Sequence, residues 1–328
     1  MRSSRGSSQK PTPNDTALCS PQAGLLTSGR FLARKWRATA AWNEQRFLGV
    51  SVHVGHPPAP EALPIPVVDN HAHLDMSRDG LDAPDLQAVI DAATAVGVPR
   101  MVQIGCDLPG ARFTVEAIDR YAALLGGVAL HPNEAPRLHD LGELESARSE
   151  IEVLASHPRV RVIGETGLDY FRTGPEGVAA QQDSFRWHID LAKRTGKVLQ
   201  IHDRDAHEDV MRILAEEGAP ERTVMHCFSG GVGMARECVE RGYLLSFAGT
   251  VTFKNARDVR DALAVTPLDN LLVETDSPFL TPAPHRGATN APYLVPLTVR
   301  AMAGVLNVDV PSLCVALAAN SERFYGPW

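Results

Sequence analysis

Two histidines separated by one residue close an apolar segment of the sequence, VVDNHAHLD at residues 67–75. Side chains at positions i and i+2 of a strand point to the same side, so His71 and His73 can reach one metal ion together while Ala72 faces away. A single histidine at a strand end is more often a hydrogen-bonded packing residue than a ligand. The pair predicts a metal-binding clamp because further ligands follow other apolar segments.

These further ligands are two imidazoles and two carboxylates, each at the end of a short apolar run: Glu165, His202, His226 and Asp276. Together with the histidine pair they exceed what one tetrahedral site with an open position uses, and they suit two ions that share a bridging carboxylate. Mixed nitrogen and oxygen ligands favour zinc, manganese or iron over calcium, and they tolerate magnesium. We expect two divalent metal ions per chain, Mg, Mn or Zn.

Two aspartates, Asp69 and Asp75, flank the histidine pair. A carboxylate that accepts the second ring N–H of a metal-bound histidine orients the imidazole. A capping or loop-turn role is at least as common for aspartate in such a position. Both interpretations stay open for these two residues.

Positioning these ligands requires a regular alternation of strands and helices from Pro66 onward. Eight short apolar, β-branched runs predict strands at 66–70, 100–105, 126–130, 159–165, 197–202, 222–227, 243–248 and 270–276. Segments with apolar residues at helical spacing lie between them, for example at 83–98, 181–196 and 205–218. The pattern predicts an α/β fold, a (β/α)8 TIM barrel, with a single catalytic domain at 66–328. In such barrels chemistry is carried at the C-terminal ends of the strands, which is where the candidate ligands fall.

The first 65 residues differ in composition, because they are rich in Ser, Pro and Arg and have weak helical periodicity. We expect residues 1–65 to be a mostly disordered N-terminal extension, or sequence upstream of the true start codon. A third interpretation is a basic arm that holds nucleic acid, because five basic residues cluster at 30–46.

The composition of the chain argues against several classes of function. A formal charge of −7 argues against a protein that coats nucleic acid through a broad basic surface, although a metal-based phosphate site stays compatible with it. The five cysteines have no paired spacing and fit a reducing cytosol. No apolar run approaches membrane-spanning length, and the N-terminus lacks an export signal. We expect a cytoplasmic protein with no membrane association and no obligate protein partner.

Six ordered motifs resemble those of the TatD family of metal-dependent deoxyribonucleases. They are VVDNHAHLD, GETGLDY (164–170), IHDRDAH (201–207), MHCFSG (225–230), ETDSPFL (274–280) and PHRGATNAPYL (284–294). The resemblance covers about residues 66–328 and implies a TIM barrel of the metal-dependent hydrolase superfamily. Many amidohydrolases of that superfamily bridge their metals with a carboxylated lysine on the fourth strand. Glu165 stands there in this chain, which weakens a dihydroorotase-like or phosphotriesterase-like interpretation.

The resemblance also implies a role for each candidate ligand. Matching residues would hold the first metal through His71, His73 and Asp276, the second through His202 and His226, and bridge the two through Glu165. The chain departs from the family at HPN (131–133), where HPH is frequent, and at NAP (290–292), where NEP is frequent.

The implied reaction is hydrolysis of a phosphodiester by water that the cations activate for in-line attack on phosphorus. Glu165 and Asp276 are the catalytic candidates, and Asp276 is either the general base or a ligand only. Arg204 and Arg286 are predicted to clamp phosphate oxygens.

Further substrate contacts are predicted at His131, His285 and Asn290. Aromatic residues could stack a terminal base or pack at the rim, namely Tyr170, Phe171 and Phe228.

Three functions remain distinct at this point. The first is a nuclease acting on DNA ends, single-stranded more than duplex, as an exonuclease. The second is a hydrolase of a small amide, lactone or ester on the same scaffold, because fold and metal site do not fix the substrate. The third is a metal-binding scaffold without catalysis, which the presence of all six ligand types disfavours.

Overall fold

The computed structural model describes residues 56–78 and 85–328, and all of these belong to one compact unit. Its eight strands form one sheet in which neighbouring strands are parallel and the order follows the sequence. The strands are β1 (Val68–Ala72), β2 (Arg100–Gly105), β3 (Leu124–Val128), β4 (Val160–Asp169), β5 (Val198–Arg204), β6 (Thr223–Met225), β7 (Leu244–Phe247) and β8 (Leu271–Val273). The predicted (β/α)8 architecture is confirmed.

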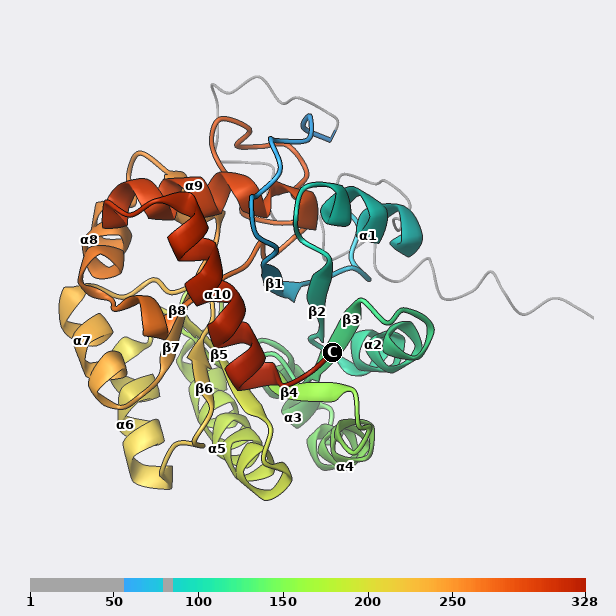
Figure 1. Cartoon of the computed structure of the whole chain (residues 1–328). Coiled ribbons are helices and arrows are strands. Elements are labelled where there is room, and N and C mark those ends of the chain that lie inside the picture. The colour runs from blue at the N-terminus through green and yellow to red at the C-terminus, as the bar shows by residue number, and fades with distance from the viewer. Residues whose placement is uncertain (1–55, 79–84) are drawn as a thin grey trace, which may run out of the picture. The chain divides into compact units, whose positions relative to one another are not determined.

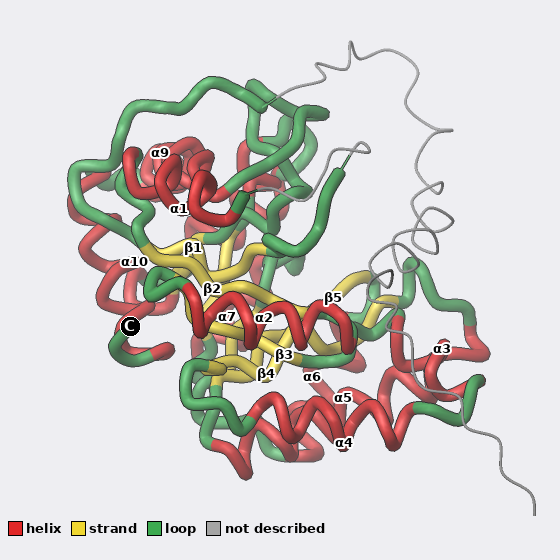
Figure 2. The backbone as a smooth tube through the Cα atoms, turned by 90° about the vertical axis from the view of Figure 1, so that its right-hand side faces the viewer, coloured by secondary structure: helices red, strands yellow, loops and turns green. Residues whose placement is uncertain are grey.

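Helices alternate with the strands and lie outside them (Figure 1; Figure 2, where strands are yellow and helices red). They are α1 (Leu86–Ala95), α2 (Leu108–Arg120), α3 (Glu134–Asp140), α4 (Leu144–Ala155), α5 (Val178–Thr195), α6 (His207–Glu217), α7 (Val232–Glu240), α8 (Arg257–Val265), α9 (Val295–Leu306) and α10 (Val310–Tyr325). Several carry local start signals: Asp85, Asp107 and Asp309 each accept a backbone N–H in the first turn of a helix.

The barrel closes where β1 meets the residues after β8. The N–H of Asp276 donates to the carbonyl of His71 (3.0 Å), and the N–H of His73 donates to the carbonyl of Ser277 (2.8 Å). Because the backbone hydrogen bonds that close the barrel involve Asp276 and both histidines, the closure itself brings these three candidate ligands together.

Strands β4 and β5 run further than the sequence predicted. Glu165 and His202 were expected to end their strands, whereas β4 continues to Asp169 and β5 to Arg204. The β3 and β6 neighbours stop earlier, and the pairing of β4 with β5 resumes after a register shift and extends to Asp169 opposite Arg204. The two expected strand ends are therefore wrong by two to four residues, and the extra pairs form a ribbon that carries Asp169 and Arg204 toward the mouth.

Apolar side chains of the strands form a buried cluster inside the barrel. They are Val102, Ile104, Leu125, Val162, Val198, Val224, Leu244 and Leu272. Phe324 and Tyr325 of α10 pack against this cluster, so α10 (red in Figure 1) covers the barrel end opposite the ligands.

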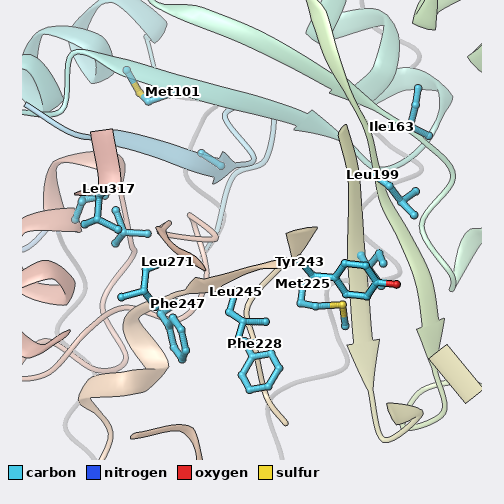
Figure 3. Close-up of a cluster of buried hydrophobic side chains, with 14 of the residues drawn as sticks. Met101, Ile163, Leu199, Met225, Phe228, Tyr243, Leu245, Phe247, Leu271 and Leu317 are labelled. Carbon is cyan, nitrogen blue, oxygen red and sulfur yellow. The ribbon is translucent and has the colours of Figure 1, made fainter. Parts of the chain in front are cut away.

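Larger apolar side chains pack between the sheet and the helices. Figure 3 shows part of this layer, in which Leu245 and Phe247 of β7 lie near Phe228. The alternation of inward and outward side chains along each strand separates the two layers.

Most of the predicted extension at 1–65 lies outside the described residues. Its last ten residues are described, and they run against the barrel: the hydroxyl of Tyr293 donates to the carbonyl of Pro57 (2.5 Å), and the N–H of Leu63 donates to the carbonyl of Val96 (3.0 Å). Leu63 is buried. In the described part of the chain no single helix is long and apolar enough to cross a membrane, although Pro292–Leu306 and Val310–Tyr325 reach that length and composition together as a pair bent by 111°.

Candidate metal centre

The two histidines of β1 point their Nε2 atoms at one place. The two nitrogens lie 3.2 Å apart. On their far sides, Nδ1 of His71 lies 2.8 Å from Oε1 of Gln200, and Nδ1 of His73 lies 3.0 Å from the carbonyl oxygen of Ile104. These oxygens can only accept, so each Nδ1 carries a proton, and Nε2 of each ring is the atom that can turn a lone pair toward a metal.

Two imidazole lone pairs at 3.2 Å repel each other, so either a proton on one nitrogen or a metal ion must lie between them. Nitrogens that are both about 2.0–2.1 Å from one zinc-sized ion and bound at a near-tetrahedral angle lie roughly 3.3 Å apart. Oδ1 of Asp276 completes the group at 3.3 Å from Nε2 of His73 and 3.8 Å from Nε2 of His71. The donor set and its spacing therefore fit a divalent metal.

The two carboxylate oxygens of Glu165 face different pairs of histidines. Oε2 lies 3.7 Å from Nε2 of His71 and 3.8 Å from Nε2 of His73. Oε1 lies 2.5 Å from Nδ1 of His202 and 3.3 Å from Nε2 of His226. One carboxylate thus faces both histidine pairs, which is the placement expected of a bridging ligand.

Each histidine of the second pair also has a carboxylate behind it. Oδ2 of Asp169 lies 3.4 Å from Nε2 of His202, and Oε1 of Glu274 lies 2.8 Å from Nδ1 of His226. Glu274 is fully buried and is held by Ser246, whose hydroxyl donates to its Oε2 (2.5 Å). A carboxylate in this position fixes the orientation of a metal-binding imidazole and raises its basicity.

For most ionisable groups of the centre, attraction between opposite charges shifts the pKa more than burial does. Burial opposes ionisation of Glu165, yet His131, His226 and His202 hold its pKa well below the usual range. Burial opposes protonation of His73 and His202, yet Asp276 raises the pKa of His73 to about 9, and Glu165 with Asp169 raises that of His202 to about 9.

His71 is the exception among the four imidazoles that are candidate ligands. Burial, and then repulsion from His226, lower its pKa. The two rings are stacked with centroids 3.6 Å apart. In the metal-free protein a neutral ring thus lies on a cationic one, and a metal that binds these nitrogens must displace protons from the charged imidazoles.

His131 differs from the other histidines in its tautomer. Its Nδ1 accepts the backbone N–H of Asn133 (3.1 Å), so the proton of the neutral ring lies on Nε2. Burial lowers the pKa of His131, which favours this neutral form. Nε2 lies 3.6 Å from Oε1 of Glu165 and presents an N–H donor to the centre, as the predicted substrate contact requires.

The two predicted phosphate-binding arginines each lie over an aromatic ring. The guanidinium carbon of Arg204 is 3.8 Å from the ring centre of Phe171, and that of Arg286 is 4.0 Å from the ring centre of Phe253. Arg204 lies at the end of the β5 ribbon and Arg286 in the loop after β8. Stacking of this kind orients a guanidinium and leaves its N–H donors free at the edge.

The loop after β8 uses Asn290 differently from the expectation. Asn290 is buried, and its amide nitrogen donates to the carbonyls of Thr275 (2.9 Å) and Phe279 (2.6 Å). Both donors of the amide are engaged, so Asn290 fixes the loop and does not offer them to a substrate. His285 lies half-buried in the same loop, where its N–H donates to the carbonyl of Pro282 (2.9 Å).

The predicted stacking residues separate into exposed and buried ones. Phe171 is 62% exposed, whereas Phe228 is buried against Phe247 with ring centres 5.9 Å apart. The hydroxyl of Tyr170 donates to Oδ2 of Asp209 (2.7 Å). Of the three, Phe171 has the most exposed ring.

Asp69 and Asp75 contact no imidazole of the pair that they flank. Asp69 accepts the N–H (2.9 Å) and the hydroxyl (2.5 Å) of Thr275, and Asp75 accepts the amide of Gln103 (2.8 Å). Of the two interpretations left open, the structural role describes both residues.

Sequence reasoning missed Gln200, Glu274 and the role of Asp169. A signal for the first two was present, because each lies two residues before a predicted ligand, on the same side of an apolar strand. Cys106 was missed as well: its thiol donates to Oε2 of Glu165 (3.4 Å) at the end of β2, and burial raises its pKa well above the usual range.

Comparison with known proteins identifies similar chains that match most of this chain and nearly all of their own length. A family model described as TatD related DNase matches residues 68–326. The uncharacterized metal-dependent hydrolase TatD of Mycobacterium tuberculosis is 45% identical over 264 residues, covering 79% of this chain and 98% of that protein. The uncharacterized metal-dependent hydrolase YabD of Bacillus subtilis is 38% identical over 259 residues, covering 78% and 98%.

Solved structures show the same fold at lower identity. The TatD homologue YJJV of Escherichia coli superposes with a TM-score of 0.73 at 24% identity, covering 80% of this chain and 98% of that one. A TatD family hydrolase of Entamoeba histolytica has a TM-score of 0.71 at 18% identity, covering 82% and 100%.

Proposed function

Because the chain belongs to the TatD family of metal-dependent hydrolases, we propose that it hydrolyses phosphodiester bonds at single-stranded DNA ends with two divalent metal ions. The observation that carries this proposal is the placement of Glu165, whose two oxygens face two separate histidine pairs. Mg, Mn or Zn fits the mixed nitrogen and oxygen ligands. The four free cysteines among the described residues suit a reducing compartment, the cytoplasm.

Divalent cations at this centre would lower the pKa of water and neutralise charge on a phosphate group. The residues around them bind and move protons. His73 holds the pKa of Asp276 below its usual value despite burial, so this carboxylate is ionised at neutral pH and can accept the proton of the attacking water. His131 directs its Nε2–H inward, where it can donate to a phosphate or leaving-group oxygen.

Two arginines, one at the end of β5 and one in the loop after β8, can offer positive charge to a DNA backbone. Arg204 and Arg286 are the predicted phosphate contacts, and the chain as a whole carries a formal charge of −7. A protein with this balance gains little from long-range attraction to duplex DNA, because non-specific binding scales with the number of phosphates that it neutralises. Recognition of an end at a local cationic site is the mode that this charge distribution favours.

The test is nucleotide release from single-stranded oligodeoxynucleotides labelled at the 3′ or the 5′ end, with Mg²⁺, Mn²⁺ or EDTA. We expect stepwise shortening that requires metal and is lost in Glu165→Ala. Glu237→Ala, which removes an exposed glutamate of α7, serves as the matched control and should retain activity. The label that is lost first gives the polarity.

A wild-type protein that binds metal and leaves every oligonucleotide intact would contradict the nuclease proposal. Small esters, lactones and amides would then be assayed with the same variants, because the same centre can activate water toward a carbonyl carbon.

A further inference from the structure

Only two of the described Phe, Tyr and Trp side chains are classed as exposed, Phe171 (62% exposed) and Phe279 (42% exposed). The other strongly exposed large apolar residues, Leu141, Val153 and Val315, belong to outer helices or their ends. Single exposed apolar residues are common and need no function. Phe171, however, follows β4, which carries Glu165, and Phe279 lies in the same loop after β8 as Asp276.

Phe171 is fixed to the side of the centre that contains His202. Its N–H donates to Oδ1 of Asp169 (3.1 Å), and the other oxygen of Asp169 faces His202 at 3.4 Å. Arg204 lies over the ring: it ends β5 opposite Asp169 of β4, and Phe171 follows Asp169 by two residues. The guanidinium leaves most of Phe171 in solvent, so the ring remains accessible.

Phe279 is fixed to the side that contains His73. Its N–H donates to the carbonyl of Asp276 (2.9 Å), and its carbonyl accepts the amide of Asn290 (2.6 Å). Its ring centre lies 6.3 Å from that of His73. Each exposed ring is thus tied through its own backbone to a carboxylate residue that faces an imidazole of the centre, at opposite ends of the ligand cluster.

We propose that Phe171 and Phe279 are two base-stacking platforms, one for each nucleobase that flanks the phosphate bound at the metal centre. The inference rests on the proposed nuclease function and adds how the substrate is held. We expect nucleobases to bind these rings. Bases alternate with phosphates along a nucleic acid, and each exposed ring lies beside a cationic site that can bind a phosphate.

The arrangement has a consequence for substrate choice. Two adjacent bases held on separate rings on either side of the phosphate are no longer stacked on each other, and in a duplex this costs a few kcal/mol of pairing and stacking. The platforms therefore select single strands, and at an end they hold the terminal and the penultimate base.

The test uses 2-aminopurine, whose fluorescence falls when it stacks on an aromatic ring. A phosphorothioate oligodeoxynucleotide that resists hydrolysis carries the probe at the terminal or at the penultimate position, and it is titrated with the metal-loaded protein. We expect quenching at both positions in the wild type. Phe171→Ala should relieve it at one position and Phe279→Ala at the other, each with at least about a five-fold loss of affinity.

Two further variants separate stacking from packing. Phe171→Leu and Phe279→Leu keep apolar volume without a ring and should behave like the alanine variants, with metal content unchanged. Val315→Ala, an equally exposed apolar position on α10, should match the wild type. Wild-type quenching and affinity in the leucine variants would overturn the proposal.

The outcomes also separate this inference from the proposed function. If the wild type cleaves DNA and its affinity and quenching are insensitive to both rings, only the platforms are refuted. If the wild type neither binds nor cleaves the oligonucleotide, both proposals fail.

Discussion

Glu274 links the buried interior of the barrel to one ligand of the metal centre. Its Oε1 lies 2.8 Å from Nδ1 of His226, and the same oxygen accepts the N–H of Cys227 (2.9 Å). Burial opposes a charge on His226, but Glu274, followed by Glu165, raises the pKa of His226 well above its usual value. The orientation and basicity of this imidazole therefore depend on a carboxylate that never reaches the metal.

Glu274→Gln keeps the size of this side chain and removes its charge. We expect metal affinity to fall by about 10- to 100-fold, because the imidazole loses the partner that fixes its tautomer. A competition titration with a chromophoric chelator measures this loss. Glu237→Gln, an exposed exchange of the same type that breaks a surface pair with Arg241, is the control. Equal affinities in the two variants would refute the role given to Glu274.

Whether the sequence could predict a residue of the centre depended on how far along the chain its partner lies. The pair His71 and His73 was predictable because its spacing of two lies within one strand. The pairing of Glu274 with His226 was not, although its place two residues before Asp276 marked Glu274 itself, because Glu274 lies 48 positions beyond His226 and meets it only when β6 and β8 fold on either side of β7. Asn290 could not be separated from a substrate contact, because its two acceptors are backbone carbonyls of its own loop.

At the scale of elements, α5 holds the segment that follows β3 through His188. The N–H of Leu130 donates to Nε2 of His188 (3.1 Å), and Nδ1 of the same ring donates to the carbonyl of Ser184 (2.7 Å). His188 is fully buried, and this burial lowers its pKa to about 3. The neutral ring thus fixes the backbone one residue before His131.

Because His188 is buried in its neutral form, we expect the stability of the fold to decrease at acidic pH. Between pH 6.5 and about 3 the unfolded chain protonates this histidine and the folded chain does not, so its contribution is present above pH 6.5 and is lost as the pH falls. The free energy of unfolding of the wild type should fall relative to that of His188→Gln by about 1.4 kcal/mol per pH unit between pH 6 and 4. Urea unfolding at several pH values measures the difference. Parallel curves for the two proteins would contradict the assignment.

The sequence predicted the order of the strands and helices better than it predicted the residues at which they end. Eight runs of β-branched residues predicted eight strands, because inward and outward faces of a buried barrel strand are both apolar. The extension of β4 to Asp169 was missed, because ETGLD contains a glycine and polar residues typical of a loop. Pairing with β5 keeps this segment extended, and that pairing is a tertiary interaction.

At the scale of the whole molecule, the C-terminal helix reaches the metal centre from the opposite end of the barrel. The hydroxyl of Tyr325 donates to Oδ1 of Asn70 (3.0 Å) and accepts from the amide of Gln200 (3.3 Å). Gln200 in turn accepts from Nδ1 of His71 (2.8 Å). A buried chain of hydrogen bonds thus connects α10 to the first ligand on β1.

Tyr325→Phe removes only the hydroxyl of this chain. We expect a loss of about 1–2 kcal/mol in the free energy of unfolding, because Asn70 and Gln200 each lose a buried partner, together with weaker metal binding. Tyr293→Phe is a matched control, because its hydroxyl also donates to a buried acceptor, the carbonyl of Pro57, away from the ligands. Urea unfolding and metal titration of both variants test this. Equal metal affinity in the two variants would show that Tyr325 stabilises the fold without affecting the metal centre.

The most direct test of the central claim is anomalous diffraction from crystals of the protein loaded with Mn²⁺ or Zn²⁺. The account predicts two peaks per chain, one between His71, His73 and Asp276 and the other between His202 and His226, with one oxygen of Glu165 on each. A single peak, or a Glu165 that contacts only one ion, would contradict the bridging arrangement on which the proposed chemistry depends.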